Sequence, residues 1–363
     1  MASPEESFRP PFCPRPKCSS HWDRTTWTYT KDGFYTRKAA PQRVQRYQCA
    51  SCRGSFSFQS FQTTYWLKKP RLLPLIFHRV LACSAYRQIA RELNVSHTTV
   101  MRQAERLGRH CLLFQEQFRK RAVLNEPLVV DGFESFEYSQ FYPCHFHLAV
   151  GAKSHFFYAF TDSELRRKGK MTAWQKRRRA DLEEQHGRPD PKSIEKEMAE
   201  LLDLVPHRGT VELRSDEHPA YPRAIRRSGI SANHSVTSSK ATRTARNPLF
   251  PVNLLDLLIR HSSSNHKRET IAFSKRRQNG AEKLAILQVW RNFLKSFSER
   301  KGGPTPAQRL ELVDRKLTVR EVLKKRLFVS RTALPERLER YYRRTIETRL
   351  IPNGRTHRLR FAD

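Results

Sequence analysis

The most restrictive feature of this 363-residue sequence is a set of short β-prone runs, two of which end in aspartate. The runs are rich in β-branched or aromatic residues and lie at 127–132, 145–152, 156–160 and 209–216. Asp131 ends the strand-like part of the first run, Asp216 ends the last, and a helical pattern at 220–227 follows. Strands that alternate with helices in this order predict an α/β domain.

Two acids at the ends of neighbouring strands indicate a divalent cation site, because a shared cation relieves the repulsion between them. Mg²⁺ (or Mn²⁺) held by carboxylates and substrate phosphate oxygens is the usual arrangement for cutting phosphodiesters. The local charge agrees with this interpretation, since residues 126–165 hold Lys153 as their single Lys or Arg against six Asp and Glu. The alternative is that this stretch forms an acidic surface loop without a ligand.

The charge of the whole chain is strongly basic. It has 69 Lys and Arg against 35 Asp and Glu, a net charge of +34. This excess predicts a polyanionic partner, and double-stranded DNA fits better than a membrane. We expect no membrane association, because no run of about 18 apolar residues is present and the N-terminus lacks the basic and apolar segments of a signal peptide. An odd number of cysteines, seven, suits a reducing cytoplasm and metal binding better than disulfides.

Two cysteine pairs near the N-terminus predict a zinc site. Cys13 and Cys18 form a Cys-x4-Cys pair, and Cys49 and Cys52 form a Cys-x2-Cys pair. Four thiolates satisfy the tetrahedral coordination of Zn²⁺ and leave no open position for catalysis. The β-prone segments between the pairs make residues 1–66 a zinc ribbon with a structural and DNA-contacting role. The alternative is a set of buried cysteines without metal.

Residues 67–122 have the pattern of a helix-turn-helix. An apolar-periodic stretch at 72–83 precedes a helix that ends near Leu93, a turn at 94–96, and a second helix capped by Ser96. We expect the second helix to read a major groove through its exposed donors. These donors are His97, Thr98, Thr99, Arg102 and Gln103. An ordinary helical hairpin is the alternative.

Three further segments are predicted to be helical. Residues 166–206 read as a charged helical hairpin inserted into the α/β domain, or else as a solvated linker. Residues 281–297 form an amphipathic pattern expected to pack on the sheet. Residues 301–363 read as a basic C-terminal arm, with a helix over 317–349 whose arginines and tyrosines suit contacts to a DNA backbone. A solvated helix face is the alternative for this arm.

The order of these pieces resembles the DDE-type insertion-sequence transposases. A zinc ribbon, a helix-turn-helix and an aspartate-bearing core occur in this order, followed by the segments 251–260 and 266–275, which look like the third-acid helix and an R-x-T-x-x-F-S-K motif. The resemblance covers roughly residues 10–300. It implies a multi-domain fold with an α/β RNase H-like catalytic core at 123–300, a helical insertion at about 166–206, and a C-terminal helical arm.

The resemblance also implies which residues carry the chemistry. Asp131 and Asp216 take the places of the first two acids. The third departs from the family pattern, in which a Glu precedes an Asn by three residues. Here Asn253 comes first and Asp256 follows on the same helix face, so Asp256 is favoured, with Glu269 as the other candidate. Arg260 and Lys267 are expected to bind flanking phosphates.

The function that follows is binding of element ends and metal-dependent cleavage and strand transfer, by a homodimer on DNA. Such a chain is expected in a bacterial cytoplasm, associated with the nucleoid. A zinc-ribbon and helix-turn-helix transcription regulator without catalysis is one alternative. A nuclease that cuts without joining and an inactive transposase copy are two others.

Overall fold

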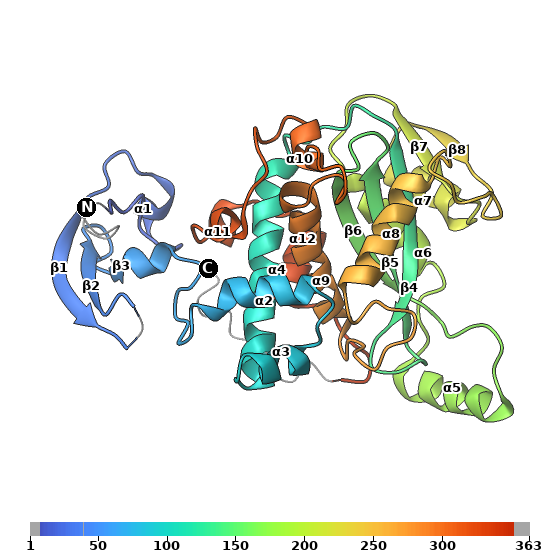
Figure 1. Ribbon diagram of the computed structural model, residues 1–363, viewed down its shortest axis with the longest axis horizontal. Helices are drawn as coiled ribbons and strands as arrows, with labels where there is room; N and C mark the ends of the chain where they lie inside the picture. The colour runs from blue at the N-terminus through green and yellow to red at the C-terminus, as the bar shows by residue number, and fades with distance from the viewer. Residues whose placement is uncertain (1–7, 39, 352–363) are drawn as a thin grey trace.

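The computed structural model describes residues 8–38 and 40–351, and the predicted ends of the zinc ribbon (1–7) and of the C-terminal arm (352–363) lie outside this description. A five-stranded sheet forms the centre of the larger part, and a three-stranded sheet forms the N-terminal part (Figure 1). The N-terminal sheet has the order β1 (Tyr29–Thr36), β2 (Arg43–Cys49) and β3 (Ser55–Ser57). The central sheet has the order β6 (Phe157–Glu164), β5 (Pro143–Gly151), β4 (Leu128–Phe136), β7 (Val211–Ser215) and β8 (Ala232–Val236).

The central sheet is mixed. β4, β5 and β6 form an antiparallel meander, whereas β7 pairs parallel to β4 on one side and to β8 on the other. The chain reaches β7 only after two helices, α5 (Ala173–His186) and α6 (Ser193–Asp203), because a parallel neighbour needs a crossover connection. The α/β prediction is therefore confirmed in its coarse form, a mixed sheet with helices.

Helices cover both faces of the sheet. Neighbouring residues of β5 show this. The Phe146 ring faces Gly280 of α9 (Arg277–Val289) on one face. On the other face, His147 is paired with Thr161 of β6, whose hydroxyl donates to the carbonyl of Glu197 in α6. α6 and α7 (Ala220–Ser228) lie on one face, and α8 (Phe250–Ser262) and α9 lie on the other (Figure 1). Because both faces are covered, β5 and β6 are buried along almost their whole length.

Strand β4 continues past Asp131, where the sequence predicted its end. The β4–β5 ladder runs without interruption from Leu128 to Phe136. The predicted end at Asp131 was wrong, because Gly132 does not interrupt the strand. The lack of a side chain at this glycine leaves room for His145 on the neighbouring strand, which a Cβ at this position would approach within 2.4 Å.

The helix-turn-helix consists of α2 (Leu72–Leu81), α3 (Tyr86–Glu92) and α4 (His97–Arg119). α4 has 23 residues and continues from the turn to the core of the larger part. There it packs against α9 so closely that a Cβ at Gly108 would lie 2.7 Å from the Cβ of Glu282. Glycine permits this approach, and the two domains are joined by a helix rather than by a linker.

The predicted helix at 281–297 is longer at its start and irregular at its end. α9 begins at Arg277, and a π-helical turn follows at Trp290–Leu294. Every face of α9 is buried, since it lies between α4 and the sheet. Gln288 donates its side-chain amide to the carbonyls of Phe157 and Tyr158, so its polar group is satisfied in this interior.

Of the predicted helical insertion at 166–206, only α5 projects from the molecule (Figure 1). α6 is part of the core, because Met198, Leu201 and Leu202 are buried against the sheet and α7. In the part of the chain that the structure describes, no helix combines the length and apolar character needed to cross a membrane.

The C-terminal arm differs from its prediction as a continuous exposed helix. It contains the short helices α10 (Pro306–Arg309), α11 (Val319–Val322) and α12 (Glu336–Arg343). Tyr341 and Tyr342 are buried, and the Arg344 guanidinium pairs with Glu105 and Glu282. These side chains hold the arm against α4 and α9, so they are not available to follow a DNA backbone.

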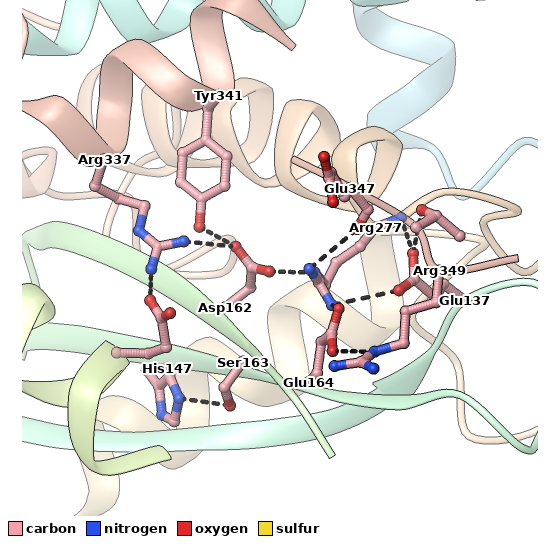
Figure 2. A network of polar contacts seen from close by, with 12 residues as sticks. Glu137, His147, Asp162, Ser163, Glu164, Arg277, Arg337, Tyr341, Glu347 and Arg349 are labelled. Carbon is pink, nitrogen blue, oxygen red and sulfur yellow. Dashed lines mark hydrogen bonds and ion pairs between the residues drawn. The ribbon is translucent and has the colours of Figure 1, made fainter. Parts of the chain in front are cut away.

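A buried ionic network attaches this arm to the sheet (Figure 2). The Arg277 guanidinium lies 3.3 Å from Glu137, 3.2 Å from Glu164, and in contact with Asp162. Asp162 also accepts a hydrogen bond from Tyr341 and pairs with Arg337 of α12 at 3.5 Å. These acids surround Arg277 so closely that its pKa is raised despite its burial.

Replacing Arg277 by leucine should destabilise the protein by about 3–5 kcal/mol, because it leaves buried carboxylates without their cation. Urea denaturation followed by circular dichroism measures this change in the free energy of unfolding. The matched control is Arg268→Leu at an exposed position, which should change it by less than about 0.5 kcal/mol. Equal effects of the two substitutions would contradict a stabilising role of the network.

Candidate functional site: a four-cysteine cluster, a helix-turn-helix surface and three aspartates

The four cysteines predicted as zinc ligands come together. The sulfur atoms of Cys13 and Cys52 lie 3.8 Å apart and those of Cys18 and Cys49 lie 3.9 Å apart. All four sulfur atoms lie within 4.8 Å of one another. This spacing is suited to one Zn²⁺ ion with four thiolate ligands.

The surroundings favour the thiolate at Cys49, whereas burial raises the pKa of Cys13 and of Cys52. Burial alone would raise the pKa of Cys49. Hydrogen bonds to its sulfur outweigh burial and lower the pKa to about 6; their donors are the backbone of Cys52, the Trp27 indole and the backbone of Ser51. The Trp27 indole nitrogen lies 3.3 Å from the Cys49 sulfur. Donors aimed at sulfur hold a ligand in its metal-binding form.

The helix-turn-helix presents most of its predicted DNA-contacting residues. The Ser96 hydroxyl caps α4 by accepting from the backbone N–H of Thr99 at 3.3 Å. His97, Thr98 and Arg102 are exposed on the first turns of α4. The hydroxyl of Thr99 is 2.9 Å from Ser96 and belongs to this cap.

Gln103 is not available for base contacts, contrary to the prediction. Its side chain is buried, and its amide donates to the carbonyl of Lys69 at 3.2 Å. The sequence pattern placed it beside Arg102 on the outer face of α4. The pattern did not show that the connector before α2 (residues 62–71), which includes Lys69, covers this side of the helix.

Asp131 and Asp216 lie at the same level on adjacent strands. β4 pairs with β7 in a parallel register that sets Leu128 opposite Leu213 and Val129 opposite Arg214. Two residues further along, this register brings Asp131 level with Asp216, which directly follows β7. Paired strands are about 4.8 Å apart, so the two carboxylates start from neighbouring backbone positions.

Asp256 reaches the same region from α8. Asp131 and Phe133 share one face of β4, and the guanidinium of Arg260 lies over the Phe133 ring at 5.3 Å. Asp256 is one helical turn before Arg260 and pairs with it at 3.0 Å. The negative charges of Asp216 and Asp256 both raise the pKa of Asp131, so all three acids lie within electrostatic range.

The pKa of Asp131 is raised above its ordinary value. Burial raises its pKa to about 7, and the two neighbouring aspartates act in the same direction. Hydrogen bonds from the backbone of Gly132 and from the Tyr221 hydroxyl, 3.4 Å from the carboxylate, oppose this shift in part. A negative charge at this position is therefore costly unless a cation offsets it.

The donor set fits Mg²⁺ or Mn²⁺ in chemical type, since all three groups are carboxylates. The carboxylates do not converge as closely as the cysteines. Among the described residues, the cysteine cluster is the one group of three or more Cys, His, Asp or Glu whose ligand atoms all lie within 4.8 Å of one another. Binding of one ion by all three acids therefore requires movement of their side chains.

The remaining predicted residues lie elsewhere or are already engaged. Glu269 and Lys267 are exposed in the loop between α8 and α9. Arg260 is occupied within the protein, because it also donates to the carbonyl of His266 at 3.2 Å. In this arrangement its guanidinium is a positioning group for Asp256 rather than an open phosphate ligand.

Three further residues near the acids were not predicted to have a role at them. Tyr221 of α7 reaches Asp131, although only the structure brings α7 to that strand. His145 and His147 lie on the opposite face of the sheet, with their Nδ1 atoms 3.1 Å apart. Their His-x-His spacing on a strand was the available signal that both side chains point to one face.

Comparison with protein-family models and with curated proteins gives no match. Among solved structures, similarity is found to a simian T-cell lymphotropic virus intasome in complex with the PP2A regulatory subunit B56 gamma. The match has 16% sequence identity and a TM-score of 0.24, and covers 52% of this chain and 55% of that chain. At this TM-score the similarity supports no inference about function. The chain spans about half the length of the intasome chain that it matches.

The cysteine cluster should bind one zinc ion per chain. Cys49→Ser should lose it, because three thiolates and a hydroxyl hold Zn²⁺ far more weakly than four thiolates. Inductively coupled plasma mass spectrometry of the purified protein measures the zinc content. Cys83→Ser is the control, since Cys83 lies outside the cluster, and it should retain zinc. Full zinc content in Cys49→Ser would contradict this assignment.

The raised pKa of Asp131 predicts a pH-dependent stability. A carboxyl group whose pKa is higher in the folded state than in the unfolded state stabilises the folded protein when it is protonated. For Asp131 this contribution is complete below the unfolded pKa, near 4, and is lost as the pH rises through about 7. Without added Mg²⁺ or Mn²⁺, Asp131→Asn should therefore gain stability over the wild-type protein between pH 4 and pH 8, by up to about 4 kcal/mol. Urea denaturation at several pH values measures this difference. A difference that does not vary with pH would contradict the prediction.

Proposed function

We propose that this chain is a DNA transposase of the DDE type, which binds the ends of an insertion sequence and catalyses metal-dependent cleavage and strand transfer. The observation that carries the proposal is the β4–β7 register that sets Asp131 level with Asp216, with Asp256 reaching the same face of β4 from α8. These residues come from two parallel neighbouring strands and a helix of the covering layer. The zinc-ribbon cluster and the helix-turn-helix agree with a partner that is double-stranded DNA.

Asp256 is the better candidate for the third acid. It lies on α8 beside β4, where its partner Arg260 covers the Phe133 ring, whereas Glu269 is exposed in the loop between α8 and α9. Asp256 is also held in place by Arg260, so its orientation relative to β4 is fixed before any ligand binds. We therefore assign the catalytic set as Asp131, Asp216 and Asp256.

Each residue has a defined part in this mechanism. Asp131, Asp216 and Asp256 would hold two divalent ions, which when bound activate the attacking oxygen and stabilise the leaving oxygen. The Tyr221 hydroxyl orients the Asp131 carboxylate through its hydrogen bond. Arg260 would position the Asp256 carboxylate, with which it pairs at 3.0 Å, and would contact a phosphate of the DNA if this pair opened.

DNA binding in this proposal relies on the exposed start of α4. His97, Thr98 and Arg102 offer donors to base edges and phosphates. Basic side chains continue around the turn, where Lys69, Arg87 and Arg91 line a hollow that also includes His97. This surface supplies the sequence-independent attraction that any protein of this class needs.

A transcription regulator without catalysis remains the second candidate, and one observation favours it. The Asp256 carboxylate is paired with Arg260, and the three acids do not converge within 4.8 Å. In a regulator this arrangement would be a permanent structural contact. The two proposals differ in whether divalent cations change the chemistry of bound DNA.

Asp131→Asn and Asp216→Asn should each lower Mn²⁺-dependent cleavage of DNA carrying the element ends by at least about 100-fold, because each removes a negatively charged metal ligand. The substrate is linear DNA that includes the sequences flanking this gene, and the products are separated on denaturing gels. Binding of the same DNA should be unchanged. Binding without cleavage by the wild-type protein would instead favour the regulator.

Two controls test the assignment of the third acid. Asp256→Asn should lose cleavage as Asp131→Asn does, whereas Glu269→Gln should retain it. Glu134→Gln controls for charge on the same strand, since Glu134 is exposed three residues after Asp131. Loss of cleavage in Glu269→Gln with full activity in Asp256→Asn would reverse the assignment.

A further inference from the structure

A basic and aromatic groove lies between the zinc-ribbon sheet and the connector that leads to α2. Its cavity of about 830 Å³ is open to solvent and within the range of ligand sites, roughly 300–1,000 Å³. One wall is the sheet face that carries Tyr35 and Arg46. The other wall is the connector, which contributes Tyr65, Trp66 and Lys68. None of the functions discussed above uses this groove.

Trp66 has an unusual backbone and exposure. Its side chain is 65% exposed, and its φ angle is 60°, in the left-handed region that bulky residues rarely adopt. The guanidinium of Arg106 in α4 fixes the connector by donating to the carbonyls of Thr63 and Tyr65, at 2.9 and 2.6 Å. A strained conformation that is held in place to expose a large ring indicates a ligand contact.

The charge of the groove is positive. Arg37, Lys38, Arg46 and Lys68 line it, and no Asp or Glu is among its described lining residues. Arg46 also pairs with Asp32 at 3.6 Å, but both side chains are largely exposed, so this pair is weak. The groove therefore suits a ligand with several negative charges and flat apolar groups.

The groove and the hollow on the helix-turn-helix have consecutive residues in their linings. Lys68 lines the groove, and the next residue, Lys69, lines the hollow at the turn before α4. A nucleic acid bound at α4 can thus pass into the groove without leaving a basic surface. Bases in a duplex are stacked on one another and cannot stack on Trp66, whereas unpaired bases can.

We propose that this groove binds unpaired nucleotides of a DNA strand, with a base stacked on Trp66 and phosphates contacted by Lys38, Arg46 and Lys68. The proposal rests on the proposed binding of DNA by the helix-turn-helix, and it adds a second site that is specific for single strands. A single-stranded segment arises wherever a DNA end is opened next to the bound duplex.

The test measures binding of the full-length, zinc-loaded protein to a fluorescein-labelled oligothymidylate of about 12 nucleotides by fluorescence anisotropy. Trp66→Gly should weaken this binding by about 5-fold to 100-fold, the range found for loss of one stacked base. Glycine is chosen because it adopts the left-handed backbone without strain. Trp66→Phe retains a ring and should weaken binding by less than about threefold.

The matched control is Trp174→Ala in α5, because Trp174 is 60% exposed and is not among the residues that line the groove. It should bind the oligothymidylate as the wild-type protein does. Zinc content and thermal unfolding establish that each variant is folded. Unchanged binding in Trp66→Gly would overturn the proposal.

Three further arms separate the alternatives. Tighter binding of an oligouridylate than of the oligothymidylate would overturn the proposal in favour of RNA. Displacement of the oligothymidylate by polyglutamate, as effective as by unlabelled oligothymidylate, would overturn it in favour of an acidic protein. Arg102→Ala should weaken binding of a blunt duplex and leave the oligothymidylate unaffected, so failure of the helix-turn-helix function is distinguishable from failure of the groove.

Discussion

The placement of three negative charges around one strand position is the constraint on which the rest of the structure depends. The parallel pairing of β4 with β7 sets Asp131 level with Asp216, and α8 brings Asp256 to the same face of β4. Such a group is unfavourable in a protein interior unless it has a partner of opposite charge. Arg260 provides one such charge, and in the proposed function divalent cations provide the others.

The sequence predicted the parts of the fold that depend on local spacing. The cysteine pairs, the cap at Ser96 and four of the five strands of the central sheet follow from patterns within a few residues, and the structure contains them, whereas β8 was not predicted. The coarse site was also predictable, because aspartates after short apolar runs indicate one edge of a sheet. The choice between Asp256 and Glu269 required the structure, since it depends on which segment of the chain packs against β4.

The predictions that failed concern side chains whose burial is decided by distant segments. Gln103 has the helical position of a DNA-contacting residue, but the connector near Lys69 covers it. Tyr341 and its basic neighbours have the composition of a DNA-binding arm, yet Tyr341 donates to Asp162, about 180 residues earlier in the chain. No periodicity in the sequence contains such pairings, because long-range ion pairs leave no local pattern.

The long helix α4 has a mechanical consequence for any DNA that binds at its start. Its 23 residues span about 34 Å, close to one turn of B-form DNA, and its far half is embedded between α9 and the C-terminal helices. A duplex held at His97 is therefore oriented by the core itself, with little freedom to pivot. The separation between a recognised sequence and the aspartates would then be fixed, with α4 as one part of the rigid connection.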